Sequence, residues 1–470
     1  MRSPKISKLR SDITRTIFGW TTGAIAVRAS GVRQTMKANR NLIHICLLYV
    51  MMLPAALQAQ FTFITNNNAI TITRYTGSNG IVTIPTMTNG YQVTTIGTNA
   101  FIGCTFITNI IIPNGIINIE DSAFWGCFGL TNMAVPDSVN SIGNFVFFDC
   151  INLTTITLGN NIRTFGFKAF SDCYSLADIN IPDSVTNIED EAFWDCSGLT
   201  NVAIPAGVVH LGDAVFYGCR GLRAILVDEN NQGYNSMAGV LFDKNRTTLI
   251  QFPEGLAGDY LIPDSVTNID AFAFGGSILN HVKIPASVQT IEDNAFGQCG
   301  ALTNVTIPNS VISIGNSSFD DCPWLASVTV GSGVTNIGDY AFAFNLNLAS
   351  IYFKGNATTN VGPDTFLNDG NTTIYYLPDT IGWSAAYDGL PAVLWNPQAQ
   401  TGDGSFGVQA NQFGFNITGT PDIPIVVEAC TNLSNAWVPL QSVSLTNGLF
   451  YFSDPQWTNY PDRFYRIRSP

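Results

Sequence analysis

A repeat of fixed length is the feature that most constrains this chain. Six cysteines follow one another at a constant spacing of 23 residues, namely Cys104, Cys127, Cys150, Cys173, Cys196 and Cys219. Eleven copies of the surrounding segment occur between Phe101 and Phe366. A period this strict is typical of a solenoid, in which each repeat forms one coil and buries its apolar face against the neighbouring coils. We therefore expect a stack of coils instead of one compact core.

The repeat unit reads L-x-x-I-x-I-P-x-x-V-x-x-I-x-x-x-A-F-x-x-C. Its first six positions alternate apolar and polar residues, which predicts a half-buried strand, and the proline that follows ends that strand. Val185, Ile188 and Phe193 illustrate the later apolar positions, which we expect to point inward while the coil returns. Because stacked strands lie about 4.8 Å apart, eleven coils predict one parallel sheet roughly 50 Å long.

The segments Ile-Pro-Asp-Ser-Val at 181–185 and Ala-Phe-Trp-Asp-Cys at 192–196 carry a family resemblance. With the period of 23, they resemble the leucine-rich repeats of the BspA type, over the chain from about Ile70 to Trp395. The resemblance implies a leucine-rich repeat solenoid on the outside of a bacterial cell, with adhesion and protein binding as the usual roles.

The predicted fold class is an all-β-rich solenoid with parallel strands, followed by a small C-terminal domain that resembles a β-sandwich. Two recurring positions form its predicted structural core. These are the phenylalanines Phe101, Phe124, Phe147, Phe170, Phe193, Phe216, Phe274, Phe296, Phe319 and Phe342, and the cysteines Cys104, Cys127, Cys150, Cys173, Cys196, Cys219, Cys299 and Cys322.

The N-terminal region is expected to be processed. The apolar run from Leu42 to Leu57 follows Lys37 and Arg40, which predicts a signal peptide over residues 36–59, cut after Ala59. The run is shorter than the roughly 20 residues of a membrane span, although a single-pass anchor is the alternative. Residues 1–35 lack repeat character and are interpreted as an upstream extension that is not translated, with Met36 as the start.

The remainder divides into a cap, a coil array and a terminal module. We predict an N-terminal cap at 60–95 and a solenoid at 96–395, with a long atypical coil at 226–262 and an exit cap at 371–395. Within the long coil, a hairpin is expected to turn at residues 243–246. A polar linker at 396–405 precedes a C-terminal β module at 406–470, which resembles terminal modules of secreted environmental bacterial proteins through Asn432 to Trp437 and the final Arg-Phe-Tyr-Arg.

The net charge of the chain limits the kinds of molecule that it is expected to bind. Without residues 1–59 the chain keeps 12 Lys and Arg against 33 Asp and Glu, a net charge of −21. Such a chain repels nucleic acid and anionic lipid surfaces, so we expect no nucleic-acid partner. We also expect no transmembrane span after signal removal, and the oligomeric state stays open.

The cysteine row allows three interpretations. Neighbouring coils bring the cysteines close enough for disulfides, but equivalent positions point their Cβ atoms the same way, and Ser277 and Asn345 fill the slot without compensation. Zinc requires converging ligands, whereas one cysteine per coil forms a row. We interpret the row as small buried thiols packed like apolar residues, with no metal or cofactor. Cys430, alone in the terminal module, is the candidate free thiol.

Catalysis is not expected. Only His210 and His281 remain after processing, and neither has a nucleophile partner set. Acidic clusters recur at one corner, at 120–121, 189–191 and 292–293. Carboxylates such as Glu189 and Glu292 could bind calcium or act on a polysaccharide, but we favour a solvated corner of the coil.

Two surfaces are candidates for binding. The first is the outward face of the strands, a small, neutral row represented by Asn132, Thr155 and Asn201. The second is an aromatic row that follows the core phenylalanine, formed by Trp125, Phe148, Trp194 and Tyr217 and broken by Ser171. Aromatic side chains anchor partners well, although packing between coils is the competing interpretation.

These features predict a secreted or cell-surface, non-catalytic scaffold for protein or glycan binding. A structural extracellular component without a discrete ligand is the first alternative, and a polysaccharide-active enzyme is the second.

Overall fold

The computed structural model describes residues 60–433, 436–460 and 462–468. The predicted upstream extension and signal peptide lie outside these residues. The described chain consists of β-strands and turns, with two short 3-10 helices, η1 (Thr446–Gly448) and η2 (Trp457–Asn459). Within the described ranges no helix has the length and hydropathy needed to cross a membrane.

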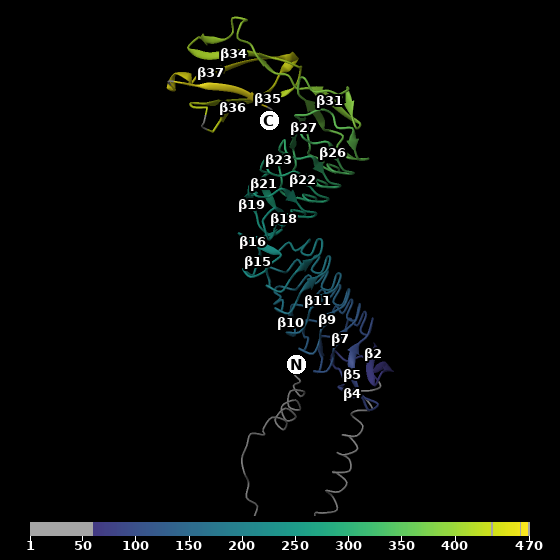
Figure 1. Ribbon diagram of the computed structural model, residues 1–470. Coiled ribbons are helices and arrows are strands. Elements are labelled where there is room, and N and C mark those ends of the chain that lie inside the picture. Colours follow the sequence, from purple (N-terminus) through teal and green to yellow (C-terminus); the bar gives the residue numbers. More distant parts are fainter. Residues whose placement is uncertain (1–59, 434–435, 461, 469–470) are drawn as a thin grey trace, which may run out of the picture. The chain divides into compact units, whose positions relative to one another are not determined.

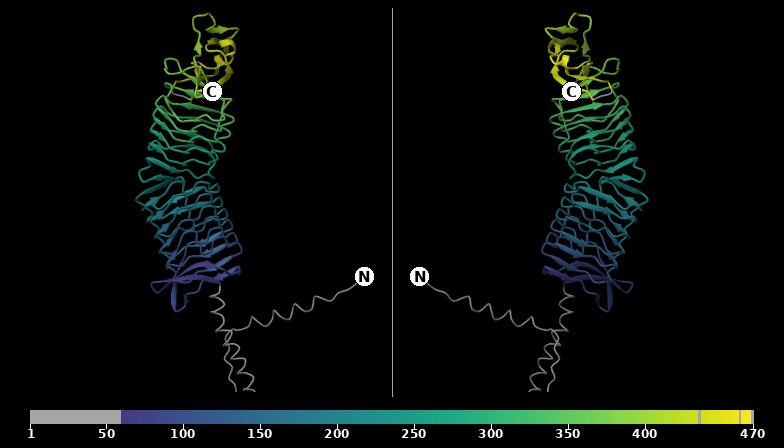
Figure 2. Two further views of the ribbon diagram at one scale, coloured as in Figure 1. Left: turned by 90° about the vertical axis from the view of Figure 1, so that its right-hand side faces the viewer. Right: turned by 90° about the vertical axis from the view of Figure 1, so that its left-hand side faces the viewer.

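Most regular coils contribute a short parallel strand at the predicted position, and the coils stack like rungs (Figures 1 and 2). These strands form a row along one side of the solenoid that is divided into four sheets, with the strand orders β10-β8-β6-β3, β13-β15, β19-β21 and β23-β25-β27-β29-β31-β30. The strands are β3 (Ile81–Thr83), β6 (Asn109–Ile111), β8 (Asn132–Ala134), β10 (Thr155–Thr157), β13 (Asn201–Ile204), β15 (Ala224–Val227), β19 (Gly258–Leu261), β21 (Leu279–Lys283), β23 (Asn304–Thr306), β25 (Ser327–Val330), β27 (Ser350–Phe353), β29 (Thr373–Tyr376), β30 (Ala386–Tyr387) and β31 (Leu390–Leu394).

The expectation of one uninterrupted sheet was wrong. Residues 176–182 form no strand, although Ile179 and Ile181 stay buried there, and the long coil separates β15 from β19. Because a proline closely follows most of these strands, each pairs through only a few residues, and a small displacement is enough to end the pairing. Side-chain burial is therefore more regular along the solenoid than strand pairing.

A second row of parallel strands runs along the returning side of the coils, which sequence analysis did not predict. Most of these strands have two residues, too few to show an alternating pattern. They form the orders β2-β5-β7-β9-β11-β12-β14 and β18-β20-β22-β24-β26-β28. Their bounds are β2 (Ala69–Tyr75), β5 (Tyr91–Ile96), β7 (Asn118–Ile119), β9 (Ser141–Ile142), β11 (Thr164–Phe165), β12 (Asn187–Ile188), β14 (His210–Leu211), β18 (Thr248–Gln251), β20 (Asn268–Ile269), β22 (Thr290–Ile291), β24 (Ser313–Ile314), β26 (Asn336–Ile337) and β28 (Asn360–Val361).

Antiparallel strands mark the irregular parts of the solenoid. At the N-terminal end β1 (Phe61–Asn66) pairs with β2, and β4 (Met87–Thr88) pairs with β5. In the long coil β16 (Tyr234–Met237), β17 (Val240–Asp243) and β18 pair in sequence. The hairpin predicted at residues 243–246 is confirmed as the connection between β17 and β18.

The core follows the axis of the coils as a column of phenylalanine rings. Phe193 lies between Phe170 and Phe216, with ring centroids 5.2 and 5.7 Å away and nearly parallel planes. The column resumes at Phe252, which the repeat pattern did not mark, and continues through Phe274 at 5.1 Å. The predicted core phenylalanines and cysteines are all buried. The buried apolar side chains form two clusters that meet at β17, because the long coil interrupts the stack.

The C-terminal module contains two antiparallel sheets around its own apolar cluster. One has β32 (Gln398–Ala399), β33 (Gly407–Gln409), β34 (Gln412–Thr418) and β37 (Leu449–Asp454), and the other has β35 (Pro424–Cys430), β36 (Val438–Ser444) and β38 (Phe464–Arg468). Residues 396–405 are not a plain linker, because β32 pairs with β34. Trp395 also packs against the module, and its Nε1 donates to the Pro424 carbonyl at 3.0 Å.

Candidate functional site

The aromatic row predicted from the sequence forms part of a larger surface, which we call the aromatic strip. Of the four predicted members, Trp125 and Phe148 meet edge to face at 5.0 Å, and Trp194 and Tyr217 meet at 4.4 Å. The strip consists of Trp125, Phe145, Phe148, Phe167, Lys168, Trp194, Tyr217 and Phe272.

The gap expected at Ser171 is closed by side chains from the preceding turn. Ser171 itself is buried. Phe145 stacks on Trp125 at 5.7 Å and meets Phe167 edge to face at 5.1 Å. The ammonium of Lys168 lies 5.4 Å from the Phe167 ring and 5.7 Å from the Trp194 ring, within reach of cation–π attraction. Aromatic and cationic contacts therefore connect Trp125 to Trp194 without a break.

Phe272 extends the strip beyond the long coil. Its ring lies 5.3 Å from Tyr217 and 6.2 Å from Trp194, so residues far apart in sequence share this surface. Phe145, Lys168 and Phe272 all have positive φ, at 55°, 52° and 59°. Bulky side chains are uncommon in this region, which costs backbone energy. These three residues were not predicted because they occupy the variable position before Ala-Phe or Val-Phe, where the phenylalanines at 145 and 272 were the available signal.

Members of the strip pack together and still reach the surface. Trp125 is 37% exposed, and the other members are partly buried. The rings contact their neighbours in adjacent coils, as the packing interpretation expects, and binding of a partner stays a prediction. A row of partly exposed aromatic rings whose side chains are already held by packing can bind a partner with little loss of side-chain entropy.

The strand-face residues lie elsewhere on the coil. Asn132, Thr155 and Asn201 are exposed on β8, β10 and β13. The amide of Asn132 donates to the Thr131 hydroxyl at 3.2 Å, and that of Asn201 to the Thr200 hydroxyl at 3.4 Å. The structure does not bring these side chains into contact with the aromatic strip, so the two predicted surfaces are separate.

The buried cysteines hydrogen bond across the coils. The Cys196 thiol donates to the Phe170 carbonyl of the preceding coil at 3.1 Å, and the same bond recurs from Cys127 to Cys219 and at Cys299 and Cys322. Asn345 repeats it with its amide, 2.9 Å from the Phe319 carbonyl. All nine cysteines of the described ranges are free thiols, Cys430 among them and buried. The apolar interpretation missed this donor role, which the replacement by Ser277 and Asn345 could have revealed.

The acidic corner also has a structural role. Asp293 Oδ1 accepts a hydrogen bond from the backbone N–H of Asn316 at 2.6 Å, and Asn316 Oδ1 accepts one from Asp339 at 2.9 Å. Asp121 and Asp190 accept equivalent bonds from the following coil. Within the described ranges no group of three or more His, Cys, Asp or Glu side chains is arranged for a metal ion. Oε2 of Glu189 lies 3.6 Å from Nε2 of His210, and both side chains are partly exposed.

Comparison with known proteins identifies the repeat. Residues 94–223 and 258–373, more than half of the chain, match the BspA type leucine rich repeat region in six copies. A leucine rich cell surface protein from Faecalibacterium prausnitzii A2-165 has 28% identity and a TM-score of 0.52, over 71% of this chain and 92% of that one.

A second solved structure shares the fold. A leucine-rich repeat protein from Eubacterium ventriosum has 24% identity and a TM-score of 0.51, over 66% of this chain and 80% of that chain. No curated protein matches this chain. The predicted leucine-rich repeat solenoid is therefore confirmed.

Proposed function

Because the chain belongs to the BspA-type leucine-rich repeat family, we propose that it is a secreted, cell-surface, non-catalytic scaffold that binds a partner protein through the aromatic strip. The observation that carries this proposal is the continuity of the strip from Trp125 to Phe272. Adhesion follows if the partner lies on another surface.

The chemistry of the strip favours a protein partner. Partly exposed tryptophan, phenylalanine and tyrosine rings supply apolar contact area, and such residues dominate the binding energy of interfaces. The strip has one cation, Lys168, which is paired with Glu191 at 2.9 Å. The net charge of −21 beyond residue 59 disfavours acidic partners, so the expected partner offers a neutral or basic apolar surface.

A pull-down from cell-envelope extracts tests the proposal, followed by titration of the captured protein. We expect saturable binding that is lost when Trp125→Ala and Trp194→Ala are combined. Trp324→Ala is the matched control, because Trp324 is 63% exposed and lies outside the strip. Equal capture by the double variant and the control contradicts the proposal, provided both melt at a similar temperature.

The second candidate function is a structural extracellular component without a discrete ligand. The exposed, neutral side chains of the strand face, such as Asn132 and Thr155, favour it because they offer no anchor. Absence of saturable capture, together with recovery of the protein in the envelope fraction, supports this candidate instead.

A further inference from the structure

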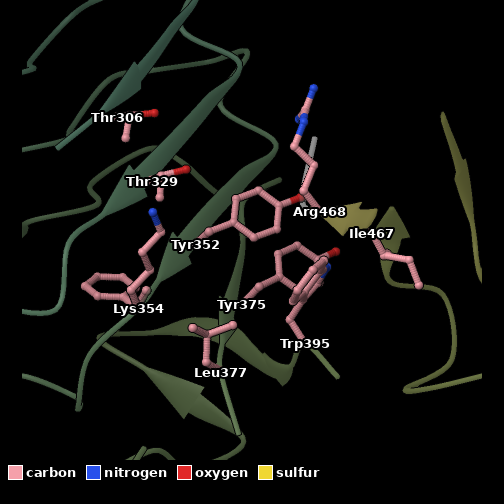
Figure 3. Close-up of a pocket in the computed structure, with 10 residues that line it drawn as sticks. Thr306, Thr329, Tyr352, Lys354, Tyr375, Leu377, Trp395, Ile467 and Arg468 are labelled. Carbon is pink, nitrogen blue, oxygen red and sulfur yellow. The ribbon is translucent and has the colours of Figure 1, made fainter. Parts of the chain in front are cut away.

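A cavity of about 500 Å³ lies where the C-terminal module meets the strand face of the last coils (Figure 3). Its lining includes Thr306, Thr329, Tyr352, Lys354 and Tyr375 from the solenoid and Arg468 from β38. Its volume is within the range of about 300–1,000 Å³ that is typical of small-ligand sites.

The cavity forms where the outward strand slot changes from threonine to tyrosine. In register along the row, Thr306 is followed by Thr329, Tyr352 and Tyr375. The two tyrosine rings stack with their centroids 5.1 Å apart. Earlier coils have residues of mixed size at this slot, among them Ala134, Ala203, Leu226 and Lys283. The two threonines therefore leave a recess beside a tyrosine wall, and the module closes one side of it.

The lining combines apolar surface with hydroxyl groups. Thr306 and Thr329 can each donate and accept hydrogen bonds through their hydroxyls. The hydroxyl of Tyr352 is buried beside the side chain of Ser350 and makes no other hydrogen bond in the described part of the chain. Burial raises the pKa of Tyr352 to about 12, so this hydroxyl keeps its proton at neutral pH. The wall thus has polar groups whose hydrogen-bonding capacity the protein leaves open.

The charge of the cavity is opposite to that of the chain. Among the described residues no acidic side chain lines it, whereas Lys354 and Arg468 both do. Within the described ranges Lys354 forms no ion pair. Arg468 and Arg466 both bind the carboxylate of Glu428, at 2.6 and 2.7 Å, so the positive charge that faces a ligand here comes chiefly from Lys354. In Figure 3 the side chains of Lys354 and Arg468 lie on either side of Tyr352. Against a net charge of −21, this local positive charge favours an anionic ligand.

We propose that this cavity binds an acidic sugar residue of a glycan. The pyranose ring lies against the tyrosine pair, its hydroxyls exchange hydrogen bonds with Thr306 and Thr329, and its carboxylate faces Lys354 and Arg468. A peptide added as an extra strand is disfavoured because the floor is the face of a sheet, where side chains and not free backbone groups meet the ligand. The site is distant in sequence from the aromatic strip and does not depend on the function proposed for it.

Calorimetric titration of the full-length protein with digalacturonate and trigalacturonate tests this assignment. The neutral comparison is a galactose oligosaccharide of the same length, and a tripeptide with a free carboxylate is the peptide comparison. We expect saturable binding of the acidic sugars alone. Lys354→Gln should weaken binding about tenfold through loss of a charge-assisted hydrogen bond, whereas Arg163→Gln, an exposed cation elsewhere on the solenoid, should leave it unchanged.

A variant that fills the recess gives a second test. Thr329→Tyr extends the tyrosine stack by one coil at a slot that already accepts aromatic residues, so the fold should persist while binding of the acidic sugar is abolished. Binding of the neutral sugar with equal strength, tighter binding of the peptide, or unchanged binding by both variants overturns the proposal. The Trp125→Ala and Trp194→Ala double variant should bind the acidic sugar normally, which separates this site from the strip.

Discussion

The backbone N–H of Gly218 donates a hydrogen bond to the carboxylate of Glu254, 36 residues later in the chain. In a regular coil the equivalent N–H bonds to a backbone carbonyl of the next coil, as Asp195 does to Tyr217 at 2.7 Å. The long coil removes that carbonyl, and the Glu254 side chain takes its place. Glu254 is only 2% exposed, and its Oε2 has no partner within the described ranges. One buried carboxyl thus joins the two halves of the column.

This position makes stability depend on pH. Burial raises the pKa of Glu254 to about 8, whereas the pKa of a glutamate in an unfolded chain is about 4.3. Between these values the folded state holds a proton that the unfolded state has released, so the free energy of unfolding falls as pH rises. Glu254→Gln keeps an acceptor for Gly218 and cannot ionise. We expect its unfolding free energy, measured by urea titration from pH 5 to 8.5, to fall less steeply than that of the parent protein.

Glu229→Gln is the matched control, because Glu229 is exposed in the same long coil. It should retain the pH slope of the parent. Identical slopes for Glu254→Gln and the parent protein would show that Glu254 titrates normally.

Removal of one core ring should destabilise the stack. Phe193 is fully buried between Phe170 and Phe216, so Phe193→Ala should cost about 3 to 5 kcal/mol by leaving a cavity. Denaturant unfolding measures the loss. Phe128→Ala serves for comparison because Phe128 is 37% exposed. A loss below about 1 kcal/mol at Phe193 is incompatible with burial of the ring.

The thiol row should be sensitive to loss of its donor. Cys196→Ala removes the hydrogen bond to the Phe170 carbonyl, which should cost about 1 to 2 kcal/mol, and Cys196→Ser should cost less because it keeps a donor. Cys104 is the first member of the row and is 9% exposed, whereas Cys196 is fully buried, so Cys104→Ala should be the milder substitution. Thermal melting ranks the three variants. If serine is as costly as alanine, the bond to Phe170 does not contribute.

Burial also raises the pKa of the Cys196 thiol well above its ordinary value. The thiolate is the reactive form, so alkylation of the folded protein should be slow at this residue. Mass spectrometry after brief treatment with iodoacetamide, with and without denaturant, checks this. Rapid labelling of Cys196 in the folded protein contradicts the buried, protonated thiol.

The acidic corner should behave as a set of backbone acceptors. Asp293→Ala removes the acceptor for the Asn316 N–H and should cost about 1 kcal/mol, whereas Asp293→Asn keeps an oxygen and should change stability by less than about 0.5 kcal/mol. Calcium should leave the melting temperature of both variants and of the parent protein unchanged. A calcium-dependent rise in the parent that Asp293→Asn abolishes would restore the metal interpretation of this corner.

The sequence predicted the repeat, the inward phenylalanines and the family, because a period of 23 constrains each coil in the same way. It did not predict the second strand row, since two-residue strands such as β12 leave no alternating pattern. The aromatic strip was predicted only in part. Trp125 and Trp194 stand at a recurring position, but Phe145 and Phe272 join them through left-handed turns that local sequence does not indicate.

Local repetition by itself determined that this chain forms coils, because each copy carries its own apolar spacing and needs only its neighbours to bury it. Tertiary structure alone decided which distant side chains come together: Phe272 meets Tyr217 over the long coil, and Arg468 lines the same cavity as the tyrosine pair of the last coils. The physical reason is that periodicity specifies contacts between equivalent residues one repeat apart, whereas these contacts join positions that no period relates.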